Sequence, residues 1–112
     1  MVKFSTEMKD LQVAVGFVKA GIAGAKCDSS AALFRFTIDG NKAILFSSNK
    51  ELFCRTHLKI KNVDGDTKAF AVSGNKLTQL ISQVEAETVT FEIDQENCKI
   101  TTGHLVVNIE LF

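Results

Sequence analysis

The sequence contains no proline, no tryptophan and no tyrosine, and its 13 basic and 13 acidic residues cancel to a net charge of zero. Without proline, turns depend on Gly, Asn, Asp and Ser, which places the clearest breaks at 39–41, 64–66 and 94–97. The balanced charge gives no global attraction to nucleic acid, membrane surfaces or acidic partners. No apolar run approaches the roughly 20 residues of a membrane span. The opening MVKFSTEMKD turns polar too early for a signal peptide, so we expect a cytoplasmic protein.

Cysteine is also sparse, with three residues at Cys27, Cys54 and Cys98. Their odd number and wide spacing argue against a disulfide framework, so we expect buried, reduced thiols. Cys54 and His57 are three positions apart on a predicted strand and therefore point to opposite faces, which keeps them from sharing a metal ion. Cys98 and His104 lie in predicted neighbouring strands without a third ligand. The sequence thus predicts no metal, no cofactor and no catalytic constellation, and we expect a protein that is not an enzyme.

Two apolar stripes at helical spacing predict two helices. With 46% hydrophobic residues, the 112-residue chain can form one domain with a core. The first stripe predicts a helix over 8–22, capped by Ser5 or Thr6, and consists of Met8, Leu11, Val15, Val18 and Ile22. The second predicts a helix over 75–85, capped by Ser73 or Asn75, and consists of Leu77, Leu80, Ile81 and Val84.

The remainder of the chain alternates with period two, which predicts short strands with one polar face and hence antiparallel pairing. One strand, one helix and three strands occur twice in succession, with the boundary near 62–66 and halves of about 1–62 and 63–112. We therefore predict a single α+β domain over 1–112, a duplicated βαβββ unit with two helices packed on one side of antiparallel sheet. The predicted strands are 2–5, 31–39, 42–48, 52–61, 68–72, 88–94, 97–102 and 104–111.

The polar faces of the two helices are the first candidate surface. Each face is either an ordinary solvated surface or a surface that attracts phosphate weakly and without sequence preference. In the second case, amide side chains would bridge to the nucleic acid through water. The residues that would face DNA in the second case are Lys9, Lys19, Lys26, Asn75, Lys76, Gln79 and Gln83.

The last predicted strand is the second candidate surface, because parts of both its faces are apolar. Either it is buried between neighbouring strands, or it is a sheet edge that pairs with a strand of another chain. In the second case the candidate subunit interface consists of Leu105, Val107 and Ile109.

Four stretches in order resemble one family. Met1–Glu7, Phe36–Leu45, Ala71–Leu77 and Glu92–Gly103 are similar to the N-terminal domain of the bacterial DNA polymerase III beta subunit, the sliding clamp. The resemblance covers nearly the whole chain, and it rests on the run of stretches in order. It implies the DNA-clamp domain fold, in which two helices line a central hole and the sheets form an outer rim.

The resemblance also implies a function. Six such domains close a ring around duplex DNA, which tethers the replicative DNA polymerase and makes the clamp a sequence-independent processivity factor. The implied partners are duplex DNA held weakly, other clamp domains or further copies of the chain, and a polymerase and clamp loader reached through the full clamp. By position, Lys26 and Lys76 match basic residues of the hole, and Val107 and Ile109 match positions at the subunit boundary.

The chain departs from the family pattern in three ways. Ser73 stands where the family has a proline, fewer basic residues follow the first helix, and one domain is present where three are needed. We therefore expect either an excised fragment or a short, divergent homologue, without the client-peptide pocket that lies between the later domains. The alternative function is a stand-alone interaction module with the same fold and no DNA encirclement. A third possible function is that of a small enzyme that uses Cys or His.

Overall fold

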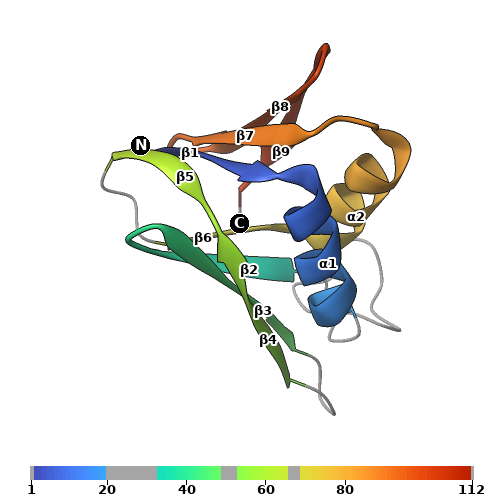
Figure 1. The fold of residues 1–112 in the computed structure, drawn as a ribbon. Helices are drawn as coiled ribbons and strands as arrows, with labels where there is room; N and C mark the ends of the chain where they lie inside the picture. Colours follow the sequence, from blue (N-terminus) through green and yellow to red (C-terminus); the bar gives the residue numbers. More distant parts are fainter. Residues whose placement is uncertain (1, 20–32, 49–52, 66–68, 112) are drawn as a thin grey trace.

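The structure is a computed structural model that describes residues 2–19, 33–48, 53–65 and 69–111. Two helices lie next to each other at one side of the molecule, and two sheets lie one above the other beside them (Figure 1). The elements in chain order are β1 (Val2–Glu7), α1 (Met8–Val18), β2 (Leu33–Asp39), β3 (Lys42–Ser48), β4 (Phe53–Lys59), β5 (Lys61–Gly65), β6 (Ala69–Ser73), α2 (Gly74–Gln83), β7 (Thr88–Ile93), β8 (Asn97–Thr102) and β9 (Leu105–Glu110).

The two halves of the chain exchange strands to build the two sheets. The five-stranded sheet has the order β5-β1-β7-β8-β9 and the four-stranded sheet the order β4-β3-β2-β6, with antiparallel pairing throughout. β1 from the first half pairs with β7 from the second, and β6 from the second half pairs with β2 from the first. The unit β1-α1-β2-β3-β4 is thus repeated by β6-α2-β7-β8-β9, which confirms the predicted duplication and the α+β class.

Four phenylalanine rings fill the junction between the two sheets. Phe4 stacks on Phe91 within the five-stranded sheet, with ring centroids 5.0 Å apart, and Phe36 stacks on Phe70 within the four-stranded sheet at 4.8 Å. Between the sheets, Phe4 lies 6.3 Å from Phe70 and Phe36 lies 5.9 Å from Phe91. Each half supplies two of the rings, so this part of the core is complete only when both halves are folded together.

Both helices cover the same side of the molecule, as predicted (Figure 1). α1 packs against β3 and β4, and α2 packs against β6 and β2. The side-chain amide nitrogen of Gln12 donates to the carbonyl oxygen of Ile81 at 3.3 Å, which joins the two helices directly. No helix in the described ranges is long and apolar enough to cross a membrane. The buried stripe residues are Met8, Leu11, Val15 and Val18 on α1, and Leu77 and Ile81 on α2.

The first helix begins without the predicted cap. α1 starts at Met8, and no side chain accepts a hydrogen bond at its N-cap position. Both candidate hydroxyls bind elsewhere, because Thr6 Oγ1 donates to the Lys59 carbonyl oxygen at 2.8 Å and Ser5 Oγ lies 3.1 Å from Thr90 Oγ1. These two residues therefore join β1 to neighbouring strands, and the prediction that one of them caps the helix is wrong.

The second helix is capped as predicted. Ser73 Oγ accepts a hydrogen bond from the backbone N–H of Lys76 at 3.3 Å, which satisfies one of the free donors at the start of α2. On the first helix, α1 ends at Val18, and Ile22 of the predicted stripe lies outside the described residues.

The predicted strand over 52–61 is in fact parts of two strands in different sheets. The chain passes from β4 to β5 at Ile60, whose backbone N–H donates to the Asn41 carbonyl oxygen at 3.0 Å. Asn62 has a φ of 56°, a left-handed conformation that Asn tolerates better than most residues, and lies at the register shift between β5 and β1. The predicted turn at 64–66 is wrong for Asp64 and Gly65, which belong to β5.

The turn between β7 and β8 lies where the sequence predicts it. One carboxylate oxygen of Asp94 accepts the backbone N–H groups of Asn97 at 2.7 Å and Glu96 at 2.8 Å. These two hydrogen bonds, that of Asn97 first, hold the pKa of Asp94 below its ordinary value because they favour the ionised carboxylate. A short polar turn therefore connects these strands without proline.

Removing a ring from the junction should destabilise the whole domain. Phe36→Ala leaves a cavity among three other rings, so we expect the free energy of unfolding to fall by about 3–5 kcal/mol. Phe53 is 66% exposed and serves as the control, since Phe53→Ala should change that free energy by no more than about 0.5 kcal/mol. Urea unfolding followed by far-ultraviolet circular dichroism measures both, and equal losses would contradict the junction described above.

Candidate functional site

The exposed polar faces of the two helices adjoin where Gln12 reaches Ile81. Residues three or four positions apart share one side of a helix, so each helix presents one continuous polar face. Among the predicted DNA-facing residues, Asn75 is half-buried and Lys26 lies outside the described residues. The exposed ones are Lys9 and Lys19 on α1, and Lys76, Gln79 and Gln83 on α2.

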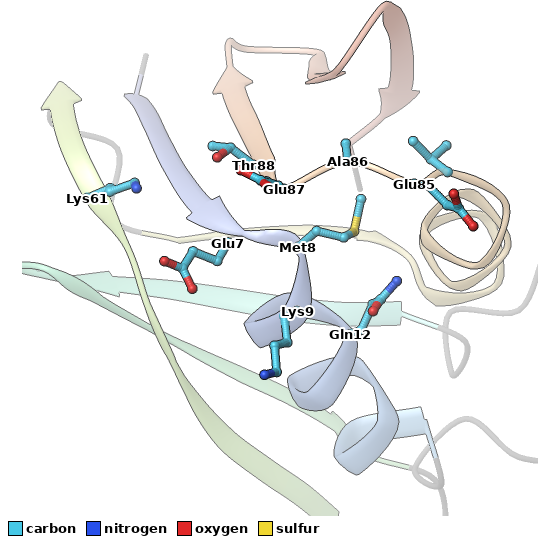
Figure 2. A pocket seen from close by; sticks show the side chains of 10 residues that line it. Glu7, Met8, Lys9, Gln12, Lys61, Glu85, Ala86, Glu87 and Thr88 are labelled. Carbon is cyan, nitrogen blue, oxygen red and sulfur yellow. The ribbon is translucent and has the colours of Figure 1, made fainter.

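A hollow of about 800 Å³ opens where the start of α1 meets the segment that joins α2 to β7 (Figure 2). The backbone N–H of Met8 donates to the Glu87 carbonyl oxygen at 2.8 Å and ties these two segments together. The charged residues lining the hollow are Glu7, Glu85, Glu87, Lys9 and Lys61. Because carboxylates outnumber ammonium groups here, Lys9 has a weaker attraction for phosphate than a cation with no acid beside it.

Two apolar side chains that sequence reasoning did not single out stand beside the edge strand β4. Val13 is 55% exposed and Phe17 is 64% exposed, and both belong to α1. They line a shallow hollow of about 290 Å³ together with Thr56, His57, Leu58 and Lys59 of β4. The sequence carried a signal for them, since Val13 and Phe17 are four positions apart and fall off the main apolar stripe.

β9 is the edge of the five-stranded sheet, and its predicted interface residues differ in exposure. Leu105 is 39% exposed and Val107 is half-buried, whereas Ile109 is 4% exposed and belongs to the core. The Ile109 side chain is therefore occupied within this chain, which corrects the expectation that it would be offered to a partner. Val106, which is 53% exposed on the other face of the strand, is the larger free apolar surface.

Among the residues that the structure describes, the sulfur and imidazole groups do not assemble into a reactive cluster. Cys54 lies on the inward side of β4, half-buried against the core, while His57 is exposed on the outward side. Cys98 is buried in β8, and burial first and the negative charge of Asp94 second raise the pKa of its thiol to about 12. Cys27 lies outside the described residues, within which no three His, Cys, Asp or Glu residues could hold a metal ion.

The fold matches that of domains in known proteins, although no family model matches the sequence and no curated protein matches it either. A Helicobacter pylori beta clamp bound to a DNA ligase peptide superimposes with a TM-score of 0.86 and 17% identity. The DNA polymerase III subunit beta of Pseudomonas aeruginosa gives a TM-score of 0.86 and 9% identity. The Caulobacter crescentus pol III beta gives a TM-score of 0.85 and 12% identity.

Each of these matches covers 98% of this chain and 30% of the matched chain. The chain therefore has the fold of one beta-clamp domain and spans about a third of the length of the clamps it resembles. Identity this low leaves the individual surface residues free to differ, so the surfaces have to be judged from the side chains of this chain.

The buried thiol should make stability depend on alkaline pH. In the unfolded chain the Cys98 thiol has its ordinary pKa of 9.0, whereas in the folded protein its pKa is about 12. Stability is therefore fully present below pH 9 and is lost as the pH rises, by about 1 kcal/mol at pH 10. Urea unfolding at pH 8 and pH 10 measures this loss, and Cys98→Ala is the reference because every other titrating group is shared. Parallel changes in the two proteins would contradict the assignment.

Proposed function

We propose that this chain acts as a domain of a DNA sliding clamp, a processivity factor that tethers a replicative DNA polymerase to duplex DNA by encirclement. The observation that carries the proposal is the beta-clamp domain fold, with two helices side by side that present exposed lysine and glutamine side chains. The proposal includes a cytoplasmic location and the loader and polymerase contacts of a full clamp. It assigns the chain no catalytic role.

The helix surface has the weak phosphate-binding character expected where DNA is retained by a closed ring. A ring around DNA needs only weak phosphate contacts, because escape requires the ring to open. Lys19 and Lys76 can attract phosphates over several ångströms, and Gln79 and Gln83 can bridge to the backbone through water. None of these groups reads a base sequence, so the contacts allow movement along the duplex.

Encirclement also requires several domains to join edge to edge. The terminal strands of the two sheets are β5, β9, β4 and β6, and of these we propose β4 and β9 as the joining edges. Pairing the β9 edge of one domain with the β4 edge of the next would continue the sheet across the boundary. It would also cover Val13 and Phe17 beside β4 with Leu105 of β9, and it would place Val106, on the other face of β9, beside the outward face of β4. The pairing thus explains why these apolar side chains are exposed in a single copy. The neighbouring domain would be another clamp domain or a second copy of this chain.

The lysines on the helices should contribute to duplex binding in proportion to the phosphates they contact. We expect Lys19→Ala/Lys76→Ala to flatten the plot of log affinity against log salt by about 0.9 for each lysine that contacts a phosphate. Lys9→Ala should have a smaller effect because carboxylates surround Lys9. Fluorescence anisotropy on a short duplex measures the slopes, with Lys3→Ala/Lys99→Ala on the five-stranded sheet as the matched control. An unchanged slope in the first variant would exclude the helix surface.

Topological retention separates the clamp from a simple interaction module. After loading onto nicked circular DNA, a clamp should remain bound at high salt and slide off when the circle is cut to a linear form. Equal retention on circular and linear DNA would instead favour the alternative, a clamp-like interaction module that does not encircle DNA.

Charges placed at the edges should block assembly. If copies of this chain join through β4 and β9, Phe17→Asp or Val106→Lys should shift the protein toward monomer, because each buries an unpaired charge at the boundary. Light scattering across a concentration series measures the mass. Val63→Ser is the control, because it changes a 38% exposed residue on β5, at the opposite edge of the five-stranded sheet from β9, and should leave the mass unaltered. A wild-type chain that is monomeric at every concentration would contradict self-assembly through these edges.

A further inference from the structure

The outward face of the four-stranded sheet carries a concentration of positive charge that the clamp proposal does not use. Strand pairing sets its outward residues in rows across β2, β3 and β4. One row is Asp39, Lys42 and Lys59, the next is Thr37, Ile44 and His57, and the next is Arg35, Phe46 and Arg55. Ser48 and Phe53 complete the face on β3 and β4. Among the described residues of these strands, four cations therefore share the face with a single carboxylate.

The other sheet shows that this segregation does not follow from the fold. The outward face of the five-stranded sheet mixes signs: Lys3 forms an ion pair with Glu92 at 3.4 Å, and Lys99 lies directly opposite Glu92 on the adjacent strand. In a chain of zero net charge, the four-stranded sheet thus holds an excess of cations. Its pairing even places Lys42 directly opposite Lys59, a repulsive like-charge pair, and Asp39 on the other side of Lys42 is the one carboxylate in that row.

Aromatic rings occupy the centre of this basic face. The guanidinium carbon of Arg35 lies 5.9 Å from the ring centroid of Phe46, and the rings of Phe46 and Phe53 are stacked with centroids 5.7 Å apart and an angle of 25°. Phe53 is 66% exposed, so the stack ends in a ring that is open to solvent. A sheet face with an open aromatic stack between arginines can hold a planar base by stacking while its cations hold the adjoining phosphates.

We propose that this basic aromatic face, formed by Arg35, Lys42, Phe46, Phe53, Arg55 and Lys59, binds single-stranded nucleic acid without sequence preference. Unpaired bases can reach the Phe53 ring, whereas the bases of a duplex are stacked inside the helix and leave Phe53 without a partner. An acidic peptide would match the charge and leave the open ring unused. The site lies on the opposite side of the four-stranded sheet from α1, so it is separate from the surface proposed for duplex DNA and does not depend on that proposal.

Binding of fluorescein-labelled oligothymidylate at low salt, followed by anisotropy, tests the proposal. We expect Phe53→Ala to weaken binding about tenfold, because stacking on one base is lost. Arg35→Ala/Arg55→Ala should flatten the salt dependence by about 0.7 for each phosphate contact removed. The matched control, Lys3→Ala/Lys99→Ala on the other sheet, should retain wild-type affinity for the oligonucleotide, and the helix variant Lys19→Ala/Lys76→Ala is measured beside it to test whether the helices bind the oligonucleotide instead.

Comparison of oligothymidylate with three other probes distinguishes the occupants; two of them have equal charge, and the third is a duplex, whose two strands carry more. Oligothymidylate should bind more tightly than an abasic oligonucleotide, a poly-glutamate peptide or a duplex of the same length. Equal affinity for oligothymidylate and poly-glutamate, with no effect of Phe53→Ala, would overturn the proposal in favour of an acidic-protein surface. Loss of binding in the helix variant with full retention in the Phe53 and arginine variants would overturn it in favour of the helix surface.

Discussion

The stack of four phenylalanine rings at the centre of the molecule is the contact on which the other features depend. Phe4 and Phe70 come from the first strands of the two halves, and these strands are the ones exchanged between the sheets. Each first strand places its ring against the second strand of the opposite half, at Phe91 or Phe36. Buried aromatic pairs gain stacking energy in addition to area burial, so the exchange has a strong local preference. A half on its own would leave two rings without partners.

The exchanged strands also determine where the candidate surfaces lie. Because each helix follows directly on an exchanged strand, β1 brings α1 and β6 brings α2 to the same side of the molecule. Since β1 joins its sheet next to β7 and β6 joins its sheet next to β2, the last strand of each repeated unit, β4 or β9, lies at the opposite edge of that sheet. The paired helix surface and the position of β4 and β9 at sheet edges are therefore consequences of the same topology.

Alternation and helical spacing were sufficient to predict the repeated unit, because Phe36 and Phe91 lie at equivalent points of matching strands. These patterns could not predict the strand exchange, because a strand shows the same alternation of apolar and polar residues whichever sheet it joins. The passage from β4 to β5 depends on the left-handed Asn62, which a run of alternating residues does not reveal. Likewise, Thr6 has the residue type of a helix cap, but its hydroxyl bonds to a strand distant in sequence. The exposure of Val106 and the burial of Ile109 depend on the same tertiary pairing.

A net charge of zero conceals how charge is distributed over this fold. Strand register brings Arg35 and Arg55 to either side of Phe46, although these residues are far apart in sequence and the chain as a whole is neutral. The compensating carboxylates include Glu7, Glu85 and Glu87, which lie at the start of α1 and after α2. Attraction to phosphate is consequently weakened near the helices and strengthened on the outward face of one sheet. A surface that needs only weak contacts and a surface that binds by charge and stacking can thus occupy one small neutral domain.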